Sequence, residues 1–150
     1  MRSILNLFML KKLLLLNLAA VSTTFIEVLW AAPDTPSGVD MNQSPLSYIE
    51  YLCLYAVVII SSVFYFAENN KITKRRQSFI YAGALVIYWY AVNYVEFETR
   101  VASWSTYSTV ETWMHVTLIS TVPLSCCILL FLISVYFIQH TKQTRQLEYD

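Results

Sequence analysis

The sequence predicts an all-α membrane protein with three transmembrane helices after an N-terminal signal segment. Hydrophobic residues make up 57% of the 150 residues, charged residues make up 13%, and there are only two glycines. Such a composition favours a small multi-span membrane protein over a soluble domain. In addition, apolar runs of membrane length recur along the chain, and about 20 apolar residues are enough to cross the hydrocarbon core of a bilayer. Polar segments separate these runs.

Residues 1–32 have the form of a signal peptide or of an N-terminal anchor. Arg2, Lys11 and Lys12 precede the apolar stretch LLLLNLAAVSTTFIEVLW, and two alanines at 31 and 32 follow it, which is the order of regions in a secretory signal. The pattern is imperfect, because Glu27 interrupts the apolar stretch and Trp30 stands where a small residue is preferred before the cleavage site. An uncleaved anchor helix therefore remains open as the alternative.

Residues 33–45 contain three of the four prolines and read as an exposed linker. Residues 46–138 are predicted to form a three-helix membrane domain, with Pro45 opening its first helix. We expect helices over about 46–66, 78–97 and 109–138, the second of them rich in aromatic residues. Residues 139–150 are polar and are expected to form a cytoplasmic tail.

The third expected helix carries hydroxyl residues at every fourth position: Thr117, Thr121 and Ser125. Residues spaced in this way share one face of a helix. Because small hydroxyl residues commonly join membrane helices, we expect this face to contact protein rather than lipid. A path for a ligand or an ion along the same face is the alternative interpretation.

Charge asymmetry predicts the orientation of the helices. The segment between the first and second helices holds Lys71, Lys74, Arg75 and Arg76, whereas acidic residues surround the next loop. An excess of basic residues marks the cytoplasmic side of a membrane protein. We therefore expect a multi-pass protein of the cell (inner) membrane, with its N-terminus external after signal cleavage and its C-terminus cytoplasmic.

The sequence contains no motif typical of a soluble enzyme. The three cysteines lie in apolar runs, and the two histidines, His115 and His140, have no nearby Cys or carboxylate spaced to complete a metal site. Phosphate-binding loops and hydrolase motifs are absent from the sequence. Net charge is zero, so no nucleic-acid partner is expected. We predict a protein that is not an enzyme, binds no metal and has the lipid bilayer as its main partner.

Two segments resemble the microbial (type 1) rhodopsins, in particular the proteorhodopsin and xanthorhodopsin type. The run SSVFYFAENNKITKRRQSFIYAGALV at 61–86 is similar to the end of helix A, the A–B loop and the start of helix B in that family. Thr121, Val122, Pro123 and Leu124 match a helix-C motif of the family. The resemblance covers about residues 40–135, which is the N-terminal portion of the family, helices A to C.

The resemblance implies a seven-helix bundle that holds retinal on a lysine of its last helix and serves as a light-driven ion pump or photoreceptor. Counted from the proline motif, the residues that do this work in the family are replaced here. Thr117 takes the place of the counterion aspartate, Met114 that of the arginine before it, and Leu118 that of a tryptophan that packs on retinal. Ile128 replaces the proton-donor glutamate, and Asn93 replaces the histidine that couples to the counterion.

The lysines are Lys11, Lys12, Lys71, Lys74 and Lys142, and the sequence places none of them at membrane depth. No retinal or other cofactor is therefore expected in this chain alone. We predict a truncated or degenerate rhodopsin-like membrane protein that is not photoactive by itself. The alternative is a small structural or interaction subunit that docks on other membrane helices, on a larger membrane complex or on further copies of itself.

Overall fold

The computed structural model describes residues 2–31, 47–100 and 107–140, and within these ranges the chain forms four helices. They are α1 (Arg2–Ala31), α2 (Ser47–Asn69), α3 (Lys74–Arg100) and α4 (Thr109–His140). All four are long and apolar enough to cross a membrane. The prediction of three transmembrane helices is wrong, because the segment interpreted as a signal peptide forms a fourth helix that packs along α2 and α4. The linker at 33–45 and the tail from 141 lie outside the described residues.

The other three helices lie where hydropathy places them, with one shift of consequence. α3 begins at Lys74 rather than near 78, so Lys74, Arg75 and Arg76 lie in its first turn instead of in a loop. α2 ends in a Schellman motif, since the Ile72 amide donates to the Ala67 carbonyl at 3.0 Å and Lys71 has a left-handed φ of 51°. This tight turn brings the start of α3 close to the end of α2.

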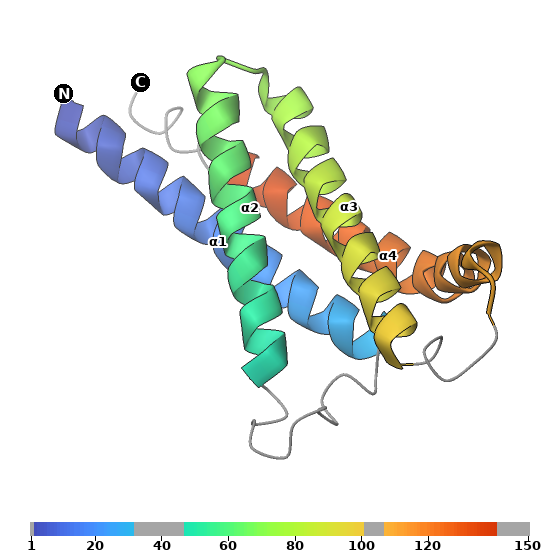
Figure 1. Ribbon diagram of the computed structural model, residues 1–150. Helices are drawn as coiled ribbons and strands as arrows, with labels where there is room; N and C mark the ends of the chain where they lie inside the picture. The colour runs from blue at the N-terminus through green and yellow to red at the C-terminus, as the bar shows by residue number, and fades with distance from the viewer. Residues whose placement is uncertain (1, 32–46, 101–106, 141–150) are drawn as a thin grey trace.

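The four helices form a ring in which each helix packs along its neighbours in the sequence, and α1 closes the ring against α4. Figure 1 shows α2 and α3 side by side, with α1 and α4 crossing behind them. α1 and α3 also touch across the ring. Consequently the N-terminal part of α1, the α2–α3 turn and the C-terminal end of α4 share one end of the bundle.

One face of each helix supplies the core. In α4 the buried residues are spaced three or four apart: Thr112, Val116, Ser120, Pro123, Cys127, Phe131 and Val135. Such spacing places all seven on one stripe, about 100° around the helix from Thr117 and Thr121. The largest fully buried aromatic side chains are those of Trp89, Tyr81, Phe64 and Phe131, and they fill the centre of the ring with residues of α2, α3 and α4.

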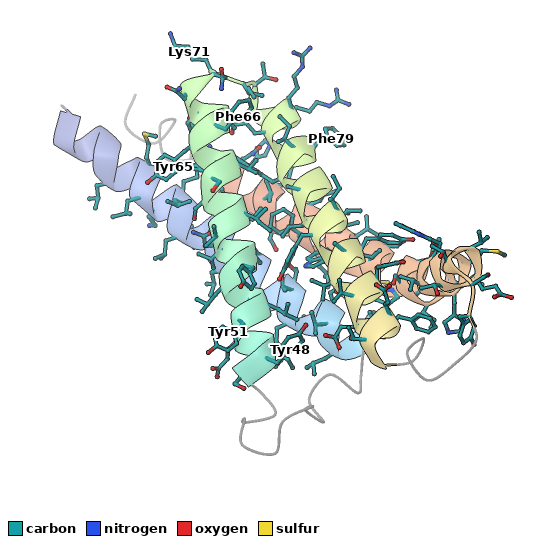
Figure 2. The ribbon with its side chains drawn as sticks, in the orientation of Figure 1. Tyr48, Tyr51, Tyr65, Phe66, Lys71 and Phe79 are labelled. Atoms are coloured by element: carbon teal, nitrogen blue, oxygen red, sulfur yellow. The ribbon has the colours of Figure 1, made fainter. Side chains whose placement is uncertain are left out.

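The outer surface of the bundle is apolar, as expected for contact with lipid. Leu10, Leu14 and Leu18 of α1 and Leu118 of α4 are each at least 60% exposed. Aromatic residues lie toward the two ends of α2, with Tyr48 and Tyr51 at one end and Tyr65 and Phe66 at the other (Figure 2). Tyr48 and Phe66 are 18 residues apart, which corresponds to about 27 Å along a helix. This is close to the thickness of the hydrocarbon core, and aromatic belts are typical of its two interfaces.

Candidate buried polar site

Polar side chains from three helices meet inside the bundle where α1, α3 and α4 converge. The Asn93 Nδ2 donates to Glu27 Oε1 at 2.8 Å and to Ser120 Oγ at 3.1 Å. Glu27 is fully buried, Ser120 is 1% exposed and Asn93 is 6% exposed. We call these three residues the buried polar cluster. One turn away, the indole nitrogen of Trp89 donates to Thr24 Oγ1 at 2.9 Å, also in the interior.

The polar residues of α1 form a row that explains why this helix belongs to the bundle. Asn17 Nδ2 donates to Ser61 Oγ of α2 at 3.0 Å, and Thr24 and Glu27 contact α3 as described above. These three residues are separated by seven and then three positions, so they lie on one face of the helix. Because a polar group buried in an apolar environment is costly unless it is hydrogen-bonded, this face must meet partners on other helices.

In its N-terminal half α1 forms an ion pair with α2. Lys12 Nζ lies 2.6 Å from Glu68 Oε1 at the end of α2 and 3.2 Å from Gln77 Oε1 of α3. The Lys12 ammonium also lies 5.2 Å from the centroid of the Phe64 ring. The side chains of Lys12 and Glu68 are 13% and 30% exposed, so this pair is screened by water less than a surface pair would be.

The buried polar cluster contains more acceptors than donors. Glu27 Oε2 and Asn93 Oδ1 are both buried and accept no hydrogen bond in the structure. A carboxyl group at such a position is stable as the neutral acid, which can itself donate, or beside a cation. The Glu27 carboxyl group can therefore hold one exchangeable proton. Among the described residues, no group of three or more His, Cys, Asp or Glu side chains is placed to bind a metal ion.

The residues singled out by the rhodopsin resemblance do not assemble into one site in this chain. Asn93 is the only one of the five altered positions that joins the buried polar cluster. Met114, Thr117 and Leu118 are exposed on the outer side of α4, with Met114 61% and Leu118 73% exposed. Ile128 is half-buried beside the core. In the proline motif, Pro123 is buried, Leu124 is half-buried, and Thr121 and Val122 are exposed.

The hydroxyl face of α4 has the expected contact with another helix only at Thr117, as far as the described residues show. Thr117, Thr121 and Ser125 are exposed, and each hydroxyl donates to the carbonyl four residues earlier, at 2.6 to 2.7 Å. A hydroxyl satisfied on its own helix needs no partner helix. Thr117 Oγ1 additionally lies 2.7 Å from the Tyr90 hydroxyl, and the Tyr90 ring stacks on Trp113 with centroids 5.6 Å apart. This outer face is thus a surface feature, separate from the buried polar cluster.

Sequence reasoning missed Glu27 as a site residue, because the acid was treated as a flaw in a signal peptide. The signal that identifies it is the row of Asn17, Thr24 and Glu27 on one face of an otherwise apolar segment. In a signal peptide that is cleaved off, such polar residues would have no hydrogen-bond partners to meet. In a helix packed among other helices, they bond to the neighbouring helices.

The fold and the cluster together define the class: a multi-pass membrane protein built as a four-helix bundle with a polar cluster in its interior. Comparison of the chain with protein-family models, with curated proteins and with solved structures finds no match.

Proposed function

We propose that this chain is a truncated or degenerate relative of the microbial rhodopsins, a membrane protein that keeps part of the helical scaffold and does no retinal photochemistry by itself. The resemblance at residues 61–86 and 121–124 supports the kinship, and one structural observation carries the absence of photochemistry: no lysine of the described residues reaches the buried polar cluster. Lys12 is 15 residues from Glu27 along α1, about 22 Å away, and Lys74 is 19 residues from Asn93 along α3, about 28 Å away. Lys11, Lys71 and Lys74 are exposed, and Lys142 lies outside the described residues.

The positions that would tune a retinal chromophore support the same proposal. A buried cationic Schiff base requires a counterion nearby, because an unpaired charge inside a membrane protein is costly. Thr117 carries no charge and lies on the outer surface of α4. The carboxyl group bonded to Asn93 belongs to Glu27 of α1 rather than to α4, and the Asn93 amide already occupies one of its oxygens.

Adding all-trans retinal to the purified chain tests this proposal. We expect no red-shifted absorption band in the visible range, while a retinal-binding microbial rhodopsin taken through the same steps as a control acquires one. A visible band that hydroxylamine bleaches would show a retinal Schiff base and overturn the proposal. Four further apolar segments encoded directly downstream, the last with a central lysine, would identify the chain as part of a divided rhodopsin rather than a relic.

The proposed orientation rests on the charges at the two ends of the bundle. Lys71, Lys74, Arg75 and Arg76 are exposed at one end, and Glu98 and Glu111 are exposed at the other. The excess of basic residues favours the first end as the cytoplasmic one. The contacts of Lys12 and Glu27 support a mature protein that retains α1, and with α1 in place the N-terminal end of the chain is cytoplasmic. The inner membrane is the expected location.

The second candidate function is that of an interaction subunit of a larger membrane complex, docked through the outer face of α3 and α4. The aromatic cluster of half-buried Tyr90 and Tyr94 with exposed Trp113 favours this role, since the Trp113 ring lies 5.6 Å and 4.7 Å from the two tyrosine rings. Recovery of the chain from native membranes only as a lone, monodisperse monomer would count against it.

A further inference from the structure

A groove lies between the first two turns of α3 and the last turns of α4, at the basic end of the bundle. Its volume is about 440 Å³, within the range of pockets that hold small organic ligands. Lys74 and Arg75 line one side, and His140 lies opposite on α4. Neither Lys74 nor Arg75 forms an ion pair with another described residue. The ion pair at this end of the bundle joins Lys12 to Glu68. Within the part of the chain that the structure describes, the groove therefore presents positive charge that no acidic side chain pairs with.

The remaining wall of the groove is apolar. Phe79, Leu132 and Tyr136 line it below the charged residues, and Phe79 and Tyr136 are 62% and 58% exposed. In Figure 2 Phe79 points outward from α3 near the end that carries Lys71. Phe79 is four residues, or about 6 Å, from Arg75 along the helix. The distance from the charged residues to the apolar wall is thus similar to the distance from the phosphate of a lipid to the start of its acyl chains.

The floor of the groove is held in place by side chains of both helices. Gln139 Nε2 donates to Ser78 Oγ at 3.1 Å and to the Lys74 carbonyl at 3.4 Å. The Tyr136 ring packs on His140, with centroids 4.3 Å apart. The two Gln139 hydrogen bonds join the end of α4 to the start of α3 and so fix the separation of the two walls, while the Tyr136–His140 contact orders the α4 wall itself.

We propose that this groove binds one anionic glycerophospholipid from the adjacent leaflet. Its phosphate lies against Lys74 and Arg75, where the N-terminal end of α3 also favours negative charge, and one acyl chain runs along Phe79, Leu132 and Tyr136. A basic pocket between transmembrane helices is suited to such headgroups. A soluble phosphate would use the charges and leave the apolar wall unused, which is why the occupant is a lipid.

The test measures binding of phosphatidylglycerol and phosphatidylcholine to the full chain in detergent by native mass spectrometry. We expect retention of one phosphatidylglycerol in preference to phosphatidylcholine. Neutralising one basic residue of the groove, Lys74→Gln or Arg75→Gln, should weaken phosphatidylglycerol binding about fivefold, and the double variant about 25-fold. Arg76→Gln is the matched control, because Arg76 is exposed in the same turn but does not line the groove.

A second variant tests the apolar wall without touching the charges. Phe79→Ala removes an exposed side chain and should leave the fold intact, while a photo-reactive phosphatidylglycerol should lose its cross-links to this wall. Equal weakening by Arg76→Gln, equal retention of phosphatidylcholine, or displacement of the lipid by inorganic phosphate at the same concentration would each overturn the proposal. So would lipid binding that appears only after Glu148→Gln and Asp150→Asn, since these two acidic side chains, rather than a lipid, would then be the partners of Lys74 and Arg75.

Discussion

Glu27 is the residue whose side chain most affects hydrogen bonding in the buried polar cluster. Its Oε1 accepts a hydrogen bond from Asn93, while its Oε2 and the Asn93 Oδ1 lack a donor. An amide in place of the carboxyl group supplies that donor and keeps the acceptor. Glu27→Gln should therefore unfold at the same temperature as the parent chain or higher, whereas Glu27→Ala should lose about 2–4 kcal/mol of stability through the lost bond and the cavity.

Thermal unfolding of the two Glu27 variants in one detergent at one pH measures this difference. Ser120→Ala serves as a control for the loss of a single cluster bond, with an expected cost of about 1 kcal/mol. Equal destabilisation by Glu27→Gln and Glu27→Ala would contradict the prediction, because it would mean that the negative charge itself is required and that a cation accompanies it.

At the scale of elements, the ion pair of Lys12 with Glu68 attaches α1 to the α2–α3 turn. Because the pair is only partly exposed, breaking it by Lys12→Met leaves the Glu68 carboxylate without its cation. The cost should be about 1–3 kcal/mol, between that of surface and buried pairs. The double variant Lys12→Met with Glu68→Gln should lose less than the sum of the two single variants, since no unpaired charge then remains.

The double-mutant cycle is measured by thermal unfolding, with Lys11→Met as the matched control. Lys11 is the neighbouring lysine on the same helix and is exposed, so its replacement should change stability little. Additive losses from Lys12→Met and Glu68→Gln would contradict a direct interaction between α1 and α2 at this point.

The comparison of sequence with structure is also clearest at the level of elements. Hydropathy and the polar breaks predict α2, α3 and α4 to within a few residues. Periodicity shows that Thr117, Thr121 and Ser125 share a face, but it cannot tell which face other helices cover. Their hydroxyls bond to their own helix, so the usual reason for expecting a partner does not apply. The role of α1 is hidden for another reason: basic residues before an apolar run are common to signals and to spanning helices.

The whole molecule gains its polar interior only with α1 present, and this determines the expected topology. Without α1, the Asn93 amide and the Trp89 indole would lose their partners Glu27 and Thr24, and Glu68 would lose Lys12. A protein with only α2, α3 and α4 would thus leave several polar groups without hydrogen-bond partners within the membrane. Each such group would reduce the stability of the fold by about 1–3 kcal/mol. We therefore expect the membrane-inserted protein to retain residues 2–31.

Intact mass measured on protein purified from membranes tests this expectation, and a tag placed before Met1 tests the resulting topology. With four spanning helices the N-terminal tag and a tag after Asp150 should lie on the same, cytoplasmic side, protected from protease added outside intact cells. A tag within the linker at 33–45 is the control and should be cleaved under the same conditions. A mass that corresponds to a chain beginning after Ala31 or Ala32 would contradict the four-helix protein. The contacts of α1 would then be absent from the mature chain.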